Sequence, residues 1–429
     1  MSEQTRPDAG VQDEATDQVE QPTYELVRTP ADGVPEVVRT PEALAATVDA
    51  LAAGSGPLAV DTERAHGFRY TGRAYLIQLR REGSGTHLID PIALAGDAER
   101  ADLSAVAHAV GDDEWILHAA TQDLPCLAEV GMLPRRLFDT ELAGRLLGFP
   151  RVALGLLIER ALGKTLAKEH SAADWSRRPL PADWLNYAAL DVELLIPLRA
   201  WVVEQLEAAG KAEWAAQEFA HLVEHAADPP PVRAEPWRRT SGTHDIRTPR
   251  GLAVVRELWH ERDALAAKLD KAPGRVLNDR AISGLAGRAE APEFVADRAA
   301  LRAVDGFKWR QASRYESNWL AALERALALP QADLPAKRPR GEGIPHPKSW
   351  PTRFPDAADR WSRLRPATLE LAEQWGLPVE NLIGPDAVRK LAWEPPSPAT
   401  EATVDTFWAI EGVRPWQREL VVPVVTPLL

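Results

Sequence analysis

The stretch PLAVDTE, residues 57–63, decides the fold class because it places a short apolar run directly before two acidic residues. A run of this length is typical of a buried strand. Alternate side chains of a strand point to one face, so the carboxylates of Asp61 and Glu63 are expected on the same side of a sheet. Two such carboxylates repel each other unless a divalent cation lies between them. Alone, however, an Asp-x-Glu pattern usually marks only a solvated strand end.

The sequence on both sides of this run predicts an α/β domain. Upstream, Thr40 and Pro41 are typical of a helix N-cap and first helical position, and Gly54 can end that helix. Strands come first along the chain and are then mixed with helices, an order that predicts an α/β domain with a mixed sheet. The expected downstream elements are strands at 74–80, 86–89 and 115–120, a helix near 99–110, and mostly helix from there to about 225.

Two further motifs carry acidic residues. Asp123 follows the predicted strand WILHAA and is expected near the start of the next helix. Tyr187 and Asp191 are four residues apart in NYAALD, so they share one face of a predicted helix. Taken singly, such a pair is more often a hydrogen bond on a helix surface than part of a site.

Taken together, these motifs resemble the exonuclease superfamily that has four acidic residues and a tyrosine in its third motif (the DEDDy type). The sequence around these motifs is similar to ribonuclease D family sequences over roughly residues 36–225. It includes VDTERAHGFRY, AYLIQL, LIDP, LHAATQDL, FDTELA, DWSRRPL and NYAALDVELLIPL. Ala172 and Ala173 differ from the residues most common at these positions in the family, but the four acids and the tyrosine are all present. The resemblance implies a ribonuclease H-like fold and a metal-dependent 3′→5′ exoribonuclease.

The resemblance also implies roles for the five side chains. Asp61 would bridge two divalent ions, Glu63 and Asp191 would hold the water-activating ion, and Asp123 would support the other ion through water. All-oxygen ligands favour Mg²⁺ or Mn²⁺ over zinc. A phenol with a pKa near 10 is a poor base at neutral pH, so we expect Tyr187 to orient the attacking water.

Nine other residues are candidates for contact with RNA. Aromatic side chains can stack on bases and basic side chains can meet phosphates, although packing under a loop or simple solvation is a common alternative for each. A buried position is the commoner reading for the tryptophan, and His118 is expected to be a core or supporting residue. The candidates are His66, Phe68, Tyr70, Lys168, Arg177, Arg178, Lys308, Trp309 and Arg310.

The downstream part of the chain resembles the paired helical nucleic-acid-binding (HRDC-type) modules of the same family. The expected division is a disordered acidic tail (1–33), the exonuclease domain (34–225), a linker (226–244), an HRDC domain (245–330), a Pro-rich basic linker (331–353) and a second HRDC-like domain (354–429). Residues 281–286 and 303–306 resemble residues 387–392 and 409–412, each at an offset of 106. This repeat favours a duplicated all-helical module over two unrelated helical units.

Charge is distributed unevenly along the chain. The 429 residues carry a net charge of −13, which argues against a simple nucleic-acid binder. Residues 229–353, however, carry 15 acidic and 23 basic residues, a net charge of +8. This segment is therefore expected to hold RNA phosphates, unless its surplus serves only solvation.

Composition predicts a cytoplasmic protein, which we expect to be a monomer. The chain has one cysteine, no apolar run long enough for a membrane span, and an acidic N-terminus unlike a signal peptide. The resemblance suggests single-stranded RNA 3′ ends, such as those of tRNA precursors, as substrate. A 3′→5′ DNA exonuclease and a catalytically silent RNA-binding protein remain alternatives. A helicase-associated module is disfavoured because the sequence has no P-loop.

Overall fold

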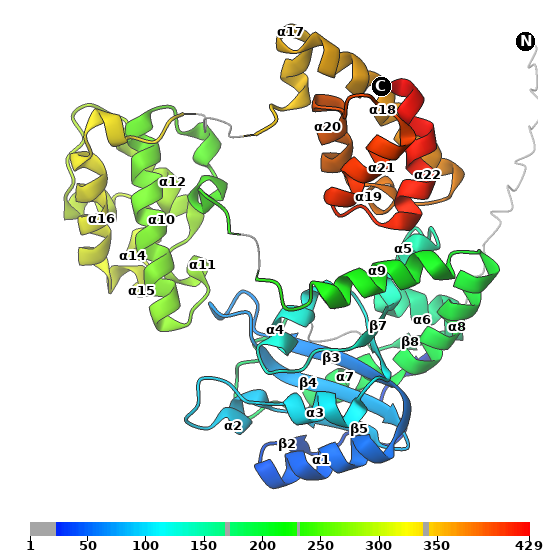
Figure 1. Ribbon diagram of the computed structural model, residues 1–429. Helices are drawn as coiled ribbons and strands as arrows, with labels where there is room; N and C mark the ends of the chain where they lie inside the picture. The colour runs from blue at the N-terminus through cyan, green and yellow to red at the C-terminus, as the bar shows by residue number, and fades with distance from the viewer. Residues whose placement is uncertain (1–22, 168–171, 230–231, 338–342) are drawn as a thin grey trace, which may run out of the picture.

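The structure is a computed structural model that describes residues 23–167, 172–229, 232–337 and 343–429 (Figure 1). Residues 1–22 of the expected disordered tail lie outside the described residues. The expectation of disorder is wrong for the end of that tail, because β1 (Glu25–Val27) pairs in parallel with β8 (Lys164–Leu166). In the described part of the chain, no helix combines the length and apolar character needed to cross a membrane.

A six-stranded mixed sheet forms the centre of the first domain, as predicted. Its strand order is β2-β5-β4-β3-β6-β7. β4 pairs antiparallel with both β3 and β5, whereas the other neighbours are parallel. The strands are β2 (Val37–Val38), β3 (Ser55–Arg64), β4 (Ala74–Glu82), β5 (Gly85–Ile89), β6 (Glu114–Leu117) and β7 (Arg136–Asp139).

Helices cover this sheet and complete the domain. α1 (Pro41–Ala53) begins at the Thr40 cap and ends at Gly54, as predicted. α7 (Ala182–Glu193) packs on β3, β4 and β5, which brings the third acidic motif against the first. The others are α2 (Pro91–Ala95), α3 (Ser104–Val110), α4 (Leu124–Ala128), α5 (Thr140–Leu146), α6 (Leu154–Leu162), α8 (Leu195–Ala208) and α9 (Ala212–Glu224).

Two details of this domain differ from the prediction. The strand expected at 115–120 ends at Leu117, because Ala119 adopts a left-handed conformation (φ 62°) and a 3₁₀ turn follows over Ala120–Gln122. His118 therefore lies just after the strand. The region after residue 120 also contains β7 and β8, two short strands that the predicted helical pattern does not include.

The second domain has its own hydrophobic core. Trp237 lies in that core although it falls in the stretch expected as a linker, and the surrounding residues form 3₁₀ turns over Pro236–Arg239 and Thr243–Asp245. The helices of this domain are α10 (Pro249–Leu269), α11 (Pro273–Val276), α12 (Asp279–Arg288), α13 (Arg298–Arg302), α14 (Asp305–Lys308), α15 (Arg310–Ser313) and α16 (Glu316–Ala328).

The third domain shares one continuous core with the first. Trp350, in the stretch expected as the second linker, is fully buried in that core, and the Trp214 and Trp416 rings stack across the contact with centroids 4.7 Å apart. The helices here are α17 (Trp350–Arg353), α18 (Pro355–Gln374), α19 (Val379–Leu382), α20 (Pro385–Trp393), α21 (Glu401–Ile410) and α22 (Pro415–Val425).

The two helical domains repeat the same arrangement at their start. α10, α11 and α12 begin at residues 249, 273 and 279, and α18, α19 and α20 begin at 355, 379 and 385. All three pairs have the 106-residue spacing seen in the sequence, which supports a duplicated module. After the third helix the copies diverge, because three short helices precede α16 whereas α21 alone precedes α22.

Both copies touch the first domain through the turn after their first helix. Asp270 (φ 44°) and Gly376 (φ 59°) both take left-handed conformations in these turns, again 106 residues apart. In the first copy, the Ala272 N–H donates to the Phe68 carbonyl at 3.0 Å. In the second copy, the buried Lys211 amine donates to the carbonyls of Leu146 and Trp375 at 2.8 and 2.9 Å.

Candidate active site

Three of the predicted carboxylates converge in the structure. Asp61 and Glu63 lie on β3, and Asp191 reaches them from α7, which packs on that strand. A carboxylate oxygen of each residue lies within 4.8 Å of the other two. The fold thus brings together acids that are far apart in the sequence and forms a donor set made entirely of oxygens.

Asp123 lies next to this group, held by a residue between the two strand acids. The Thr62 hydroxyl donates a 2.6 Å hydrogen bond to Asp123 Oδ1. The Cys126 thiol lies 3.4 Å from the Thr62 hydroxyl and donates to the Asp123 carbonyl at 3.1 Å. Asp123 is at the N-terminus of α4, as expected, and its negative charge acts on the Asp61 carboxyl.

Burial and mutual repulsion disfavour four ionised carboxylates here. Burial raises the pKa of Asp61 well above its ordinary value, and the charges of Asp191 and Asp123 raise it further. Burial, followed by the charges of Asp61, Asp191 and Asp123, raises the pKa of Glu63 to about 10. Burial also raises the pKa of Asp191 to about 7 and that of Asp123 to about 6. Protons or cations must therefore compensate the cluster, and its buried oxygen donors fit a hard divalent ion.

Tyr187 is held against the same group. Its hydroxyl hydrogen bond lowers the pKa of Asp191, so the phenol is the donor and the carboxylate the acceptor. Burial raises the pKa of Tyr187 itself, and the charges of Asp191, Glu63 and Asp61 raise it further. The phenol thus keeps its proton at neutral pH and can act as a hydrogen-bond donor.

Asp139, the aspartate of the FDTELA motif, is a supporting residue that is not among the predicted site residues. It is buried at the end of β7, and its carboxylate accepts hydrogen bonds from the N–H groups of Ala119 and Ala120 at 3.1 and 2.8 Å. These bonds hold the left-handed turn that leads to Asp123. His118 beside it contacts the Thr140 hydroxyl at 2.9 Å, and burial lowers the pKa of its ring to about 4.

Two of the aromatic candidates contact the second domain. The Arg275 guanidinium lies 4.0 Å from the centroid of the Phe68 ring, and the Tyr70 hydroxyl donates to Asp263 at 3.2 Å. In this structure both side chains form part of an interdomain contact. His66 is exposed at the start of the same loop.

The predicted phosphate contact at Arg178 is not what the structure supports. Its guanidinium donates to both carboxylate oxygens of the buried Asp90 at 2.8 Å and to the carbonyls of Tyr75 and Trp175. These hydrogen bonds hold the DWSRRPL segment against the sheet, so the N–H donors of Arg178 that make them are not directed at a phosphate. Arg177 is exposed, and Lys168 lies outside the described residues.

The basic candidates of the second domain are at its surface. Trp309 is 58% exposed, so the expectation that it is buried is wrong. Lys308 and Arg310 flank it and are also exposed, with the Lys308 amine 3.0 Å from the Asp305 carboxylate. An exposed tryptophan between two cations can stack on a base while its neighbours meet phosphates.

Family models describe all three domains. Residues 35–207 match a 3′–5′ exonuclease domain, and residues 251–323 match the HRDC domain. Residues 343–429 match a model described as the C-terminal domain of a 3′ to 5′ exonuclease. The second helical domain thus has a family description of its own.

Whole-chain comparisons agree with these matches. A ribonuclease D of Acidiphilium cryptum is 32% identical over 72% of this chain and 76% of its own length. One from Nitrobacter hamburgensis is 34% identical over 52% of this chain, and the matched region spans 58% of that relative. A crystal structure of a Bifidobacterium adolescentis protein superposes with a TM-score of 0.83, at 39% identity over 94% of this chain and 99% of the other. Escherichia coli RNase D shares the fold, with a TM-score of 0.64 at 24% identity over 92% of this chain and 98% of its own. The chain belongs to the ribonuclease D family of 3′→5′ exoribonucleases.

Proposed function

We propose that this protein hydrolyses RNA from its 3′ ends at a centre formed by Asp61, Glu63, Asp123, Asp191 and Tyr187. The observation that carries this proposal is the convergence of three carboxylates from β3 and α7 within 4.8 Å, with a protonated phenol hydrogen-bonded to one of them. Such a cluster destabilises the empty protein, so it is best explained by a ligand of opposite charge.

The carboxylates would hold two divalent ions, Mg²⁺ or Mn²⁺. Asp61, Glu63 and Asp191 would hold these ions, and Asp123 beside them would support the group. When bound, the ions supply an activated water and compensate the charge that develops on the departing 3′-oxygen. Hard oxygen donors suit Mg²⁺ and Mn²⁺ better than zinc.

The side chains of the protein itself would fix the geometry around that chemistry. Tyr187, whose O–H is donated to Asp191, would orient the attacking water by accepting a hydrogen bond at its hydroxyl oxygen rather than remove a proton from it. Thr62 and Asp139 would act as positioning residues, because the first binds the Asp123 carboxylate and the second holds the turn before it.

RNA would be held mainly by the second domain. Residues 229–353 carry the positive surplus of the chain, and Lys308, Trp309 and Arg310 form an exposed cationic and aromatic patch within it. Phosphate contacts give sequence-independent affinity, which suits an enzyme that removes successive nucleotides. The acidic first domain would then act on RNA that another domain holds.

The natural substrate we propose is the 3′ end of a stable RNA such as a tRNA precursor. Support comes from the resemblance to ribonuclease D and from Escherichia coli RNase D, which is described as an exoribonuclease involved in structured RNA processing. We further propose that the protein works as a monomer and that it is cytoplasmic. A free, buried Cys126 suits the reducing cytoplasm.

The test is a time course on single-stranded RNA labelled at either end. Released mononucleotides from the 3′ label, with stepwise shortening of the 5′-labelled strand, are expected with Mg²⁺ or Mn²⁺ and not with EDTA. A matched DNA strand measures polymer preference, and faster cleavage of DNA would favour the alternative DNA exonuclease. Absence of cleavage with either ion would contradict a hydrolytic function and favour a silent RNA-binding protein.

A further inference from the structure

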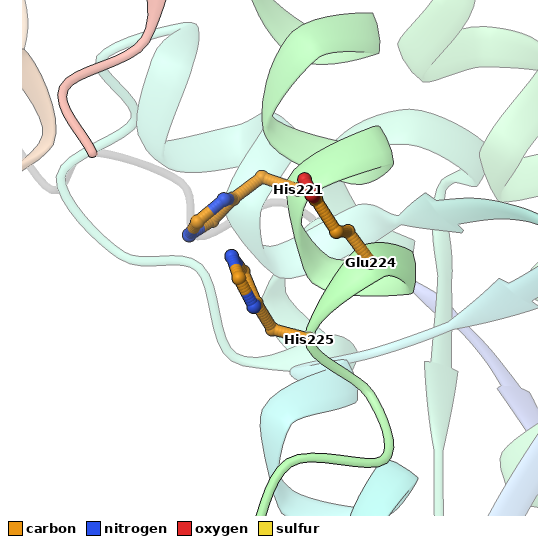
Figure 2. A group of neighbouring side chains, drawn as sticks. All are labelled: His221, Glu224 and His225. Carbon is orange, nitrogen blue, oxygen red and sulfur yellow. The ribbon is translucent and has the colours of Figure 1, made fainter. Parts of the chain in front are cut away.

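A second group of metal-binding side chains lies on α9, away from the carboxylate cluster. His221, Glu224 and His225 each offer a ligand atom, and these atoms lie within 4.8 Å of one another. Figure 2 shows both imidazole rings projecting from the same side of the helix, and their centroids are 4.3 Å apart. Residues three and four apart share one helical face, so the H-x-x-E-H spacing itself produces this grouping.

We propose that His221, Glu224 and His225 bind a transition-metal ion, of which Zn²⁺ is the best fit. Two imidazoles and one carboxylate form a donor set that suits zinc, whereas Mg²⁺ prefers oxygen ligands only. The site therefore differs in chemistry from the all-oxygen cluster of the first motif. The three side chains line an open cavity of about 410 Å³, from which water would complete the coordination of a bound ion.

A carboxylate orients one of the two rings. His225 Nδ1 lies 2.9 Å from Asp228 Oδ2, and since an ionised carboxylate can only accept, Nδ1 carries the proton. The other ring nitrogen, Nε2, then keeps its lone pair for a ligand. Carboxylates in this supporting position are usual for histidines that bind metal ions.

Charged groups of both signs surround the site. The acidic groups that face the site are Glu218, Glu224 and Asp228, whereas Arg414 from the loop before α22 is the basic group and pairs with both oxygens of Glu218 at 2.9 and 3.0 Å. The three side chains also lie at the C-terminal end of a 13-residue helix, where the helix dipole favours positive charge.

The site also lies beside a domain contact. Residues 412–415 of the third domain line the same cavity as His221 and His225. In this contact Trp416 donates from its backbone N–H to Gln217 and from its indole N–H to Glu218. An ion bound here would therefore stabilise the end of α9 where the third domain docks.

The experiment is a calorimetric Zn²⁺ titration of the full, untagged chain. A Glu63→Gln background weakens the carboxylate cluster, so zinc bound there is separated from zinc on α9. In this background we expect one equivalent of Zn²⁺, lost in His221→Ala/His225→Ala and weakened about tenfold in Asp228→Asn, the usual effect of removing a carboxylate that orients a histidine ligand. His244→Ala, which removes a histidine whose side chain is 83% exposed, is the control and should bind as its parent does.

A second readout reports the ligand type and keeps the test independent of folding. Co²⁺ should give a visible spectrum in the Glu63→Gln protein that the double histidine variant lacks, while circular dichroism shows that both are folded. Unchanged stoichiometry and affinity after removal of both histidines would overturn the proposal, and so would an absence of zinc binding in the Glu63→Gln background.

Discussion

The Thr62 hydroxyl donates a 2.6 Å hydrogen bond to the Asp123 carboxylate, which ties the second acidic motif to the strand that carries the first. Thr62 stands between Asp61 and Glu63, so a single strand supplies two acids of the site and the anchor of a third. The position of Asp123 thus depends on a side chain that binds no ion itself.

Replacing Thr62 by valine keeps the volume but removes this donor. A hydrogen bond to a charged group contributes about 1.5–3 kcal/mol, so we expect kcat/KM on single-stranded RNA to fall at least about tenfold. Thr62→Ser retains the hydroxyl and should keep most of the activity. Steady-state rates of the two variants at saturating Mg²⁺ make the comparison, and equal loss in both would show that packing rather than the hydrogen bond matters.

The acids and the tyrosine should differ in how strongly they affect turnover. Asp61→Asn or Asp191→Asn removes a proposed ion ligand, and we expect no measurable cleavage. Tyr187→Phe removes only an orienting hydrogen bond, so a measurable rate should remain. Single-turnover assays, together with Mn²⁺ titration of each variant, separate loss of ion binding from loss of chemistry. If Tyr187→Phe is as inactive as Asp61→Asn while it binds the ion normally, the tyrosine acts as a base.

Stability without divalent ions should fall as pH rises. A carboxyl whose pKa is raised on folding binds more protons in the folded state, so the free energy of unfolding decreases between its unfolded and folded pKa values. For Asp191, whose folded pKa is about 7, this window runs from about pH 4 to pH 7. We therefore expect the increase in Tm on adding Mg²⁺ to an EDTA-treated sample to grow from pH 5 to pH 7.

Differential scanning fluorimetry at several pH values measures this increase. Asp191→Asn cannot lose a proton at that position, so its ion-free Tm should vary less with pH than that of the unmodified protein. A Mg²⁺-dependent increase of the same size at pH 5 and pH 7 would contradict the assignment of the cluster as an ion site.

The surface of the second domain should control affinity for long RNA. Lys308→Ala/Arg310→Ala removes two exposed cations, and we expect weaker binding with a salt slope reduced by about 1 for each lost phosphate contact. Arg100→Ala/Arg135→Ala removes two exposed cations of the first domain and serves as the matched control. RNA-binding isotherms of the two double variants at several salt concentrations measure the affinity and its salt slope. Equal losses of affinity in both variants would show that net charge alone governs RNA binding.

The sequence predicts the catalytic domain and its acids well because their signals are local. The Thr40 cap, the long strand around Asp61 and the helix that carries Asp191 are each readable from neighbouring residues. That these acids converge is implied by the resemblance, and the packing of α7 on β3 provides the physical reason.

Other features depend on tertiary contacts that no local pattern reveals. The early end of the strand at Leu117 follows from the left-handed Ala119, which the distant Asp139 holds in place. The proline-rich sequences around Trp237 and Trp350 predict linkers and give no sign that these side chains are buried in domain cores. The H-x-x-E-H spacing on α9 is visible in the sequence, but the approach of Arg414 is not.

The left-handed turns at Asp270 and Gly376 are equivalent in the two repeats but contact different parts of the first domain, Tyr70 in one case and Gly148 in the other. Gly148 approaches the carbonyl of Gly376 so closely that a Cβ atom at position 148 would lie 2.1 Å from it. Alanine at position 148 would therefore disrupt the contact of the third domain and leave the contact of the second domain at Asp270 intact.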